Sequence, residues 1–237
     1  MLDNIRKFYD KIKLGDVSED PEEQVPITYV HVFHKEYPRL PSVDLPKSEA
    51  NSELETLLEM RKSTRNFSDS PLRLEEIARI LRSCRIIGLN GGPEKRTYPS
   101  GGARFPVELY LAVYNVDGLV NGAYHYSIKK EKLELLLKKD LISRRRELIS
   151  PYLENPAATV IFTTVLARSE VKYGSRAYPY SLIEAGHMGQ NIHLVCAEMG
   201  VGSCSVSGFV DNSVAEIFDL TEDEIPVYSI SVGWRRR

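Results

Sequence analysis

The chain has 237 residues, of which 42% are hydrophobic and 27% charged, and its formal net charge is −2 at pH 7. This is the composition of a soluble globular protein with room for a substantial core. The small net charge argues against nucleic acid as a partner. No apolar run approaches the ~20 residues of a membrane-spanning helix, and the charged N-terminus lacks the apolar core of a signal peptide. We therefore expect a cytoplasmic protein that binds neither membranes nor nucleic acids.

The first 46 residues differ in pattern from the rest of the chain. Residues 2–14 have the apolar spacing of a short amphipathic helix, and residues 15–46 are rich in proline and acidic residues. The second pattern is typical of an extended arm that has no core of its own. The sequence thus predicts an N-terminal helix and arm over residues 1–46 and a folded domain over residues 47–237.

Helical and strand patterns interleave within the folded domain. Apolar residues at helical spacing predict helices at residues 52–63, 73–88, 131–149, 178–200 and 212–220. β-Rich stretches predict strands at residues 107–116, 123–128, 158–166, 203–209 and 225–234. The dipeptide Asp117-Gly118 indicates a hairpin between the first two strands, so part of the sheet is antiparallel. The fold class is therefore α+β rather than a doubly wound sheet.

The stretch Arg-Lys-Ser-Thr-Arg, residues 61–65, falls at the end of the first helix of this domain. It has two interpretations. Cations at a helix C-terminus interact favourably with the helix dipole and imply no ligand. Alternatively, Arg61 and Arg65 flank the Ser63 hydroxyl, and two guanidiniums with a hydroxyl suit a phosphate dianion.

A second stretch, Pro-Ser-Gly-Gly at residues 99–102, precedes the strand predicted from residue 107. It fits a plain turn. Two adjacent glycines also allow a backbone to approach a ligand closely and to present its N–H groups to a flat polar edge. Arg104 stands immediately downstream as a charge partner for such a ligand.

Two candidate binding motifs are rejected. Residues 200–209 nearly match G-x-G-x-x-G, but Ser205 replaces the third glycine and the stretch follows a helix, whereas a dinucleotide-binding turn follows a strand. Glu184 and His187 have the spacing of a di-iron ligand pair, but such a site needs a second pair. We expect no metal, and we expect His193 to be hydrogen-bonded or at an edge of the long helix. Three widely spaced cysteines, Cys84, Cys196 and Cys204, indicate neither disulfides nor zinc.

Lys172 and Tyr173 lie in a segment rich in tyrosine and basic residues that follows a predicted buried strand. Either side chain serves as a general acid or base when burial shifts its pKa. The alternative is an exposed, aromatic-rich turn without chemistry.

The order and spacing of these stretches resemble the nitroreductase-like FMN flavoproteins, and in particular their azoline (thiazoline and oxazoline) dehydrogenase branch. The resemblance runs from about Leu45 to Trp234 and rests on five stretches: RKSTRNFSDSPLRLEEIARIL, RTYPSGGARFPVELYLAV, GAYHYSIKKEKLELL, YSLIEAGHMGQNIHLVCAEMGVGSCSVSGF and VYSISVGW. It implies a nitroreductase-like α+β fold with a mainly antiparallel sheet flanked by helices. It also implies a homodimer in which both subunits contribute to each FMN site.

The resemblance assigns roles residue by residue. The implied FMN-binding residues are Arg61, Lys62, Ser63 and Arg65 for the phosphate and ribityl chain, Pro99, Ser100, Gly101 and Gly102 for a loop reaching the flavin ring from the partner subunit, Ser207 and Gly208 for backbone N–H groups near the ring, and Arg235 for a further phosphate charge. Lys172 and Tyr173 resemble the catalytic Lys-Tyr pair that removes a proton in azoline-oxidising relatives.

The resemblance predicts an FMN-dependent oxidoreductase that passes hydride from NAD(P)H to a small-molecule acceptor. One alternative is a dehydrogenase that oxidises azoline rings in a peptide substrate. Another is a flavin-binding or sensing protein without turnover. Fold fixes the cofactor better than it fixes the substrate.

Overall fold

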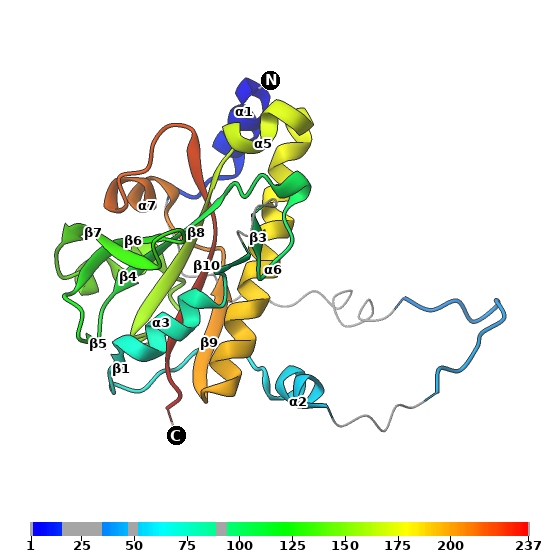
Figure 1. Cartoon of the computed structure of the whole chain (residues 1–237), viewed down its shortest axis with the longest axis horizontal. Coiled ribbons are helices and arrows are strands. Elements are labelled where there is room, and N and C mark those ends of the chain that lie inside the picture. Colours follow the sequence, from blue (N-terminus) through cyan, green and yellow to red (C-terminus); the bar gives the residue numbers. More distant parts are fainter. Residues whose placement is uncertain (1, 16–34, 47–51, 89–93, 237) are drawn as a thin grey trace.

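The computed structural model of the chain describes residues 2–15, 35–46, 52–88 and 94–236 (Figure 1). The predicted N-terminal helix is present as α1, Leu2–Ile12. Residues 35–46 of the predicted arm are exposed and form neither helix nor strand. Residues 16–34 of the arm, and the domain boundary drawn after residue 46, lie outside the described residues.

The domain is built on a six-stranded sheet whose neighbouring strands are all antiparallel. In spatial order the strands are β7 (Lys132–Lys138), β6 (Gly122–Ser127), β4 (Val107–Val113), β8 (Ala158–Val165), β10 (Glu224–Trp234) and β9 (Val201–Val206). The hairpin expected around Asp117-Gly118 pairs β4 with β6. The predicted α+β class with a mainly antiparallel sheet is therefore confirmed.

Helices cover both faces of the sheet (Figure 1). One face is covered by α3 (Leu74–Arg82) and the long α6 (Ala177–Glu198), and the other by α4 (Arg145–Leu148) and α7 (Asp211–Ile217). Helix α5 (Ala167–Tyr173) connects β8 to α6 and lies with α1 at one end of the molecule. No described helix is long and apolar enough to cross a membrane.

The sheet separates two hydrophobic cores, and β4 shows how one strand serves both. Leu109 and Leu111 belong to the core beneath α6, whereas Tyr110 and Ala112 belong to the core beneath α7. This is the two-residue alternation of strand side chains, with apolar residues on both faces because both faces are covered. Each fully buried leucine contributes roughly 1.5–3 kcal/mol through removal of its surface from water.

The helix α2, Glu53–Met60, begins as its sequence predicts. The Ser52 hydroxyl accepts the Glu55 backbone N–H at 3.2 Å, and the Glu55 carboxylate accepts the Ser52 N–H at 2.9 Å. This reciprocal capping box stabilises the first turn. The helix ends at Met60, so the chain turns to an extended conformation at Arg61, where the basic stretch starts.

Residues 131–149 are not one helix, which corrects the sequence-based prediction. Residues 132–138 form strand β7, and only the short α4 and a 3₁₀ turn at Ile142–Arg144 follow it. The lysines, leucines and glutamates of this segment favour a helix intrinsically, but pairing with β6 satisfies the backbone in the sheet instead.

The helix predicted over residues 73–88 is also shorter than expected. It ends at Arg82, and Ile86–Gly88 forms strand β2, which pairs with β3, Lys95–Arg96. The β-branched pair Ile86-Ile87 favours this extended conformation. Two-residue strands β1, Leu72–Arg73, and β5, Val116–Asp117, form a separate parallel pair.

Candidate functional site

The basic stretch after α2 lies against the outer strand β9. The Thr64 N–H donates to the Ser203 carbonyl at 2.9 Å, and the Ser68 N–H donates to the Trp234 carbonyl at 2.8 Å. On its other side, the Glu154 N–H donates to the Arg65 carbonyl at 2.9 Å. These backbone bonds fix residues 63–68 along the free edge of the sheet.

The segments that meet at this edge carry three arginines. Within the described part of the chain, Arg61, Arg65 and Arg235 form no ion pair. The buried Arg235 Nε and the buried Thr64 Oγ1 also have no hydrogen-bond partner among the described residues. Unpaired buried donors are costly, so this arrangement fits an anion that would accept them.

Gly202 on β9 makes the close approach possible. A Cβ atom there would lie 2.8–2.9 Å from the Thr64 side chain and 3.1 Å from Arg235 Cγ. Contacts under 3 Å are not tolerated by real Cβ atoms, so a larger residue would separate β9 from the segment that carries the arginines.

Beneath this edge, His193 of α6 is held between two serines of β9. Its Nδ1 lies 2.7 Å from Ser203 Oγ and its Nε2 lies 2.6 Å from Ser205 Oγ. Burial, together with the nearby charge of Arg61, lowers the pKa of His193 to about 4. The imidazole is therefore neutral at pH 7, which confirms the expected hydrogen-bonded, structural histidine.

Ser207 and Gly208 follow the end of β9 on the same edge. The Ser150 hydroxyl donates to the Gly208 carbonyl at 3.5 Å, and the Val210 N–H donates to the Glu147 carbonyl at 2.8 Å. Within the described residues, the N–H groups of Ser207 and Gly208 donate to no acceptor. We call Arg61, Ser63, Arg65, Ser207, Gly208 and Arg235 the edge cluster. Lys62 is exposed in the same segment.

The Pro-Ser-Gly-Gly stretch forms a tight 3₁₀ turn at Gly101–Ala103. Gly102 has φ +62°, and Ala103 and Phe105 also have positive φ values, of 53° and 48°. A non-glycine residue in this region is strained, by about 1–3 kcal/mol each, and needs surrounding support. The predicted turn is therefore present, with a strained backbone immediately after it.

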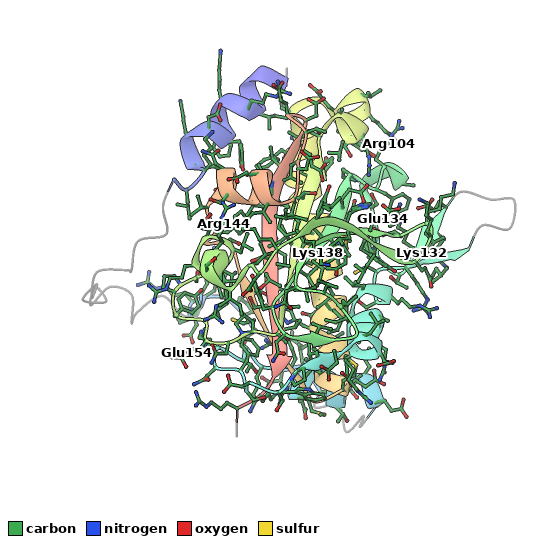
Figure 2. All side chains as sticks on the ribbon, turned by 90° about the vertical axis from the view of Figure 1, so that its left-hand side faces the viewer. Arg104, Lys132, Glu134, Lys138, Arg144 and Glu154 are labelled. Atoms are coloured by element: carbon green, nitrogen blue, oxygen red, sulfur yellow. The ribbon has the colours of Figure 1, made fainter. Side chains whose placement is uncertain are left out.

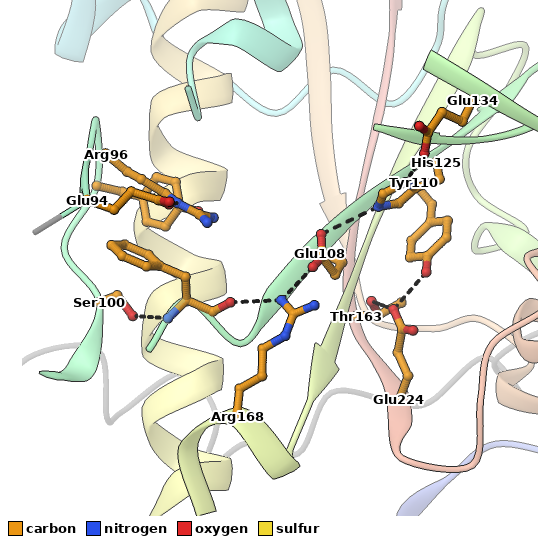
Figure 3. Close-up of polar contacts among 12 residues, drawn as sticks. Glu94, Arg96, Ser100, Glu108, Tyr110, His125, Glu134, Thr163, Arg168 and Glu224 are labelled. Atoms are coloured by element: carbon orange, nitrogen blue, oxygen red, sulfur yellow. Dashed lines mark hydrogen bonds and ion pairs between the residues drawn. The ribbon is translucent and has the colours of Figure 1, made fainter. Parts of the chain in front are cut away.

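Two side chains provide that support (Figure 3). The Ser100 hydroxyl accepts the Phe105 N–H at 2.9 Å, and Arg168 Nη1 donates to the Phe105 carbonyl at 3.1 Å. Arg168 is itself paired with Glu108, at 2.5 Å, and Glu108 lies beside His125. The loop is thereby tied to α5 and to strand β4.

Lys172 and Tyr173 lie against this loop. A Cβ atom at Gly102 would overlap the Tyr173 hydroxyl and would lie 2.9 Å from Lys172 Nζ. The Tyr173 ring packs edge-on against Tyr180, with ring centroids 5.1 Å apart. The structure thus brings together the glycine loop and the Lys-Tyr pair, which lie seventy positions apart in the sequence. We call Pro99–Gly102, Lys172 and Tyr173 the loop cluster. Tyr173 is half-buried in a helix, so the exposed-turn interpretation is wrong for it.

Glu184 also belongs to this region, although its sequence pattern suggested a role only as a metal ligand. Glu184 of α6 is 2% exposed, and its Oε1 has no partner among the described residues. Burial raises the pKa of Glu184 to about 7, although the Ser100 hydroxyl and the Arg96 charge oppose the shift. Its burial could have been anticipated, because it continues the stripe of Ala177, Ser181 and Met188 at helical spacing. The described residues contain no group of three or more histidine, cysteine or acidic side chains placed to hold a metal.

The edge cluster and the loop cluster do not meet within one chain. Tyr180 of α6 packs at the loop and His193 at β9, and thirteen residues of helix span about 20 Å. Figure 2 shows the same separation between Arg104, next to the loop, and Glu154, next to Arg65, toward opposite ends of the molecule.

Comparisons with known proteins agree on one family. The model of the Nitroreductase family matches residues 58–234. MJ1384 of Methanocaldococcus jannaschii, which carries a nitroreductase name, is 30% identical over 193 residues, covering 81% of this chain and 95% of that protein. The microcin B17-processing protein McbC of Escherichia coli is 29% identical over 165 residues, covering 66% of this chain and 60% of McbC. The FMN reductase (NADPH) of Bacillus subtilis is 23% identical over 197 residues, covering 77% of this chain and 66% of the reductase.

Among solved structures, a chain of the E. coli microcin synthetase McbBCD complex with truncated pro-MccB17 bound has the same fold. It superposes with a TM-score of 0.82 at 24% identity, covering 100% of this chain and 93% of that chain. At this identity the likeness concerns the fold alone.

Proposed function

The chain belongs to the nitroreductase family and is an oxidoreductase on that ground, and we propose that it uses FMN in sites shared between two identical subunits. The observation that carries the proposal is the separation of the two clusters at opposite ends of α6. Each contains residues that the family resemblance assigns to one FMN, and neither is complete alone. A second copy supplies the missing half.

The edge cluster fits the phosphate end of such a cofactor. Arg61, Arg65 and Arg235 have no carboxylate partner among the described residues, and a phosphate dianion accepts charge-assisted hydrogen bonds from guanidiniums. The N–H groups of Ser207 and Gly208, which have no acceptor among the described residues, follow the end of β9. Backbone donors there would stabilise negative charge that develops during reduction.

FMN supplies the hydride-transfer chemistry when bound, and the protein supplies position and electrostatics. We propose NAD(P)H as the hydride donor and a small molecule as the acceptor, as the sequence led us to expect. The FMN reductase (NADPH) among the relatives supports this reaction. No separate nucleotide-binding domain is required in this proposal, since the nicotinamide would stack at the flavin.

A second reaction is favoured by Lys172 and Tyr173 at Gly102. Oxidation of an azoline ring removes a hydride from one ring carbon and a proton from its neighbour, which leaves an azole. FMN would supply the hydride acceptor when bound, Lys172 or Tyr173 would accept the proton, and dioxygen would be the final oxidant. The peptide-processing McbC among the relatives supports a substrate of this class.

The first test is an absorbance spectrum of the purified chain, followed by anaerobic additions of NADH and NADPH. A flavin spectrum that bleaches supports the nicotinamide-linked reaction. Bound flavin that remains oxidised with both nucleotides, but is reduced by an azoline-containing peptide, supports the second reaction. Bound flavin that neither donor reduces would overturn both reactions, and a chain that does not bind added FMN would overturn the proposal itself.

The shared site is tested by mixing two inactive variants. One carries Arg61→Ala and Arg65→Ala at the edge cluster, and the other carries Lys172→Ala and Tyr173→Phe at the loop cluster. In random heterodimers one of the two sites has both halves intact, so about a quarter of wild-type turnover should return. The double variant Arg79→Ala/Arg82→Ala on α3 controls for lost charge and should retain FMN. A site contained within one subunit would give no recovery on mixing.

A further inference from the structure

Phe105 is the last residue of the strained backbone around the glycine loop, and a side chain of α5 holds its carbonyl group. Gly102, Ala103 and Phe105 all have positive φ values. The Phe105 N–H stays within the loop, because it donates to the Ser100 hydroxyl at 2.9 Å. The Phe105 carbonyl instead accepts a hydrogen bond from Arg168 Nη1 at 3.1 Å (Figure 3). Arg168 therefore joins the strained backbone to α5.

The same helix reaches the loop at its other end. Arg168 lies in the first turn of α5, and Lys172 and Tyr173 lie in its last turn. A Cβ atom at Gly102 would lie 2.9 Å from Lys172 Nζ and would overlap the Tyr173 hydroxyl. Residues four apart in a helix share a face, so Arg168 and Lys172 lie on the same side of α5. The helix is thus attached at two points, Phe105 and Gly102, which fixes its position and its rotation relative to the loop.

A carboxylate of the sheet anchors the guanidinium. The Arg168 nitrogen that donates to Phe105 also lies 2.5 Å from Glu108 Oε1, and Glu108 belongs to β4. The Glu108 side chain is only 18% exposed, so solvent screens this ion pair less than it would at an open surface. Glu108 Oε2 lies 3.5 Å from His125 Nε2 of β6, and His125 Nδ1 lies 3.1 Å from Glu134 Oε2 of β7. The anchor of Arg168 therefore spans three neighbouring strands.

We propose that Arg168 is a positioning residue that sets Lys172 and Tyr173 against the glycine loop. Glu108 holds its guanidinium in place. The Nη1 nitrogen of Arg168 carries two hydrogens, so it donates to the Glu108 carboxylate and to the Phe105 carbonyl at the same time. That the positioned pair acts on a substrate at the flavin rests on the proposed function, whereas the link between Arg168 and the loop does not.

This position has a consequence for turnover rather than for cofactor affinity. Reacting groups must lie in a narrow geometry, and a displacement of about 1 Å costs on the order of 100-fold in rate. Arg168 acts through Lys172 and Tyr173 and not on the reacting atoms, so its loss should slow the reaction. FMN affinity should remain, because the proposed phosphate site is the edge cluster at the other end of α6.

The first measurement is amide hydrogen exchange in the purified full chain, for the wild type and for Arg168→Met. Methionine keeps a long apolar stem but has no hydrogen to donate. The reporting amides are those of Ala103 and Phe105, which donate to the Ser100 carbonyl and hydroxyl respectively. We expect both to exchange about fivefold faster in the variant, because a hydrogen bond from a charged group to the neighbouring carbonyl is lost. Amides of the central strand β8 should not change.

Two further variants show whether the charged donor is responsible. Arg168→Lys restores a charged donor and should return the exchange of these amides toward the wild-type rate. Arg79→Met is the matched control, because its guanidinium also pairs with a carboxylate, that of Glu198, but far from the loop in sequence and on another helix. It should leave the exchange of the loop amides unchanged.

The second measurement compares turnover and FMN affinity in the same variants, using the donor that reduces the flavin in the redox tests. Arg168→Met should lower kcat at least about tenfold while the FMN dissociation constant changes less than about threefold. Arg168→Lys should recover part of the lost turnover, and Arg79→Met should match the wild type.

Unchanged loop exchange in Arg168→Met would overturn the proposal. Equal acceleration in the loop and in β8 would also overturn it, because the variant would then be destabilised as a whole. Faster loop exchange with wild-type kcat would show that the link does not position the catalytic pair. If Arg168→Met does not fold, Glu108→Gln removes the anchor instead and should accelerate exchange at the same two amides. A chain that binds no FMN would overturn the proposed function, whereas the exchange measurements test the link to the loop in either case.

Discussion

The two ends of α6 each bury an ionisable side chain, but they satisfy it differently. His193 has both ring nitrogens hydrogen-bonded, at 2.7 Å to Ser203 and 2.6 Å to Ser205. Glu184, nine residues earlier, is 2% exposed, and its Oε1 has no hydrogen-bond partner in the described structure. Burial disfavours the charged form of both groups. It lowers the pKa of His193 to about 4, so the imidazole is neutral at pH 7, and it raises the pKa of Glu184 to about 7.

The two clusters also differ in what holds them. Backbone hydrogen bonds to Ser203 and Trp234 fix the edge cluster, which makes it part of the sheet. Side chains such as Ser100 and Arg168 hold the loop cluster on a backbone with positive φ values. We therefore expect substitutions at the edge to affect folding and cofactor affinity together, and substitutions at the loop to act locally.

The largest expected effect is that of Gly202→Val at the edge. The valine side chain would displace Thr64 and Arg235, because these residues leave no room even for a Cβ atom at position 202. We expect FMN affinity to fall at least 100-fold and the free energy of unfolding to fall by about 1–3 kcal/mol. Flavin fluorescence titration and urea unfolding measure the two effects.

The matched control for this substitution is Gly186→Ala on α6, where no described atom lies within 4 Å of the new Cβ atom. Alanine there should leave stability unchanged or raise it by up to about 1 kcal/mol. Wild-type FMN affinity in Gly202→Val would show that the edge cluster is not the phosphate site.

An intermediate effect is expected in the pH dependence of stability, where the two ends of α6 oppose each other. Glu184 keeps its proton up to about pH 7 in the native state but loses it near 4.5 when unfolded, so its contribution falls as pH rises through this range. His193 stays neutral down to about pH 4 but gains a proton near 6.5 when unfolded, so its contribution falls as pH decreases. The contributions of these two groups therefore nearly cancel in the wild type. Together they should leave its free energy of unfolding almost constant between pH 4.5 and 6.5.

Single substitutions should expose the opposing slopes. With Glu184→Gln, the free energy of unfolding should rise with pH across this range, and with His193→Gln it should fall, each by about 2–3 kcal/mol in total. Urea unfolding at half-unit pH intervals measures both. Parallel curves for the two variants would contradict the assigned pKa shifts.

The smallest effect on stability is expected from Gly102→Ala at the loop. The positive φ of this residue costs alanine about 1 kcal/mol, and the ends of the Lys172 and Tyr173 side chains must move away. FMN affinity should change only a few-fold, because the phosphate is held at the other cluster, while turnover should fall by more than tenfold. A loss of FMN affinity as large as that in Gly202→Val would remove the distinction between the clusters.

Local signals in the sequence identified most elements and most candidate residues. Apolar residues at helical spacing marked the helix that begins after Ser52, and the paired glycines marked a turn, in which Gly102 has a positive φ. Residues 131–149 were mispredicted because their leucines suit both a helix and a strand, and only β6 decides between them. Glu184 was overlooked as a buried acid because the residues that influence its carboxyl, such as Ser100 and Arg96, are far from it in sequence.

By itself, the sequence determined the helices and strands with strong periodicity, the arginines of residues 61–65, the glycine turn and the Lys-Tyr pair. Each of these features can be recognised from residues that are adjacent in the sequence. Only the tertiary structure decided that Tyr173 meets Gly102, that Thr64 and Arg235 meet over Gly202, and that α6 keeps the two clusters about 20 Å apart. Hydrogen-bond partners, burial and the resulting pKa shifts depend on residues brought together by the sheet. They are therefore properties of the packed chain and not of any single stretch.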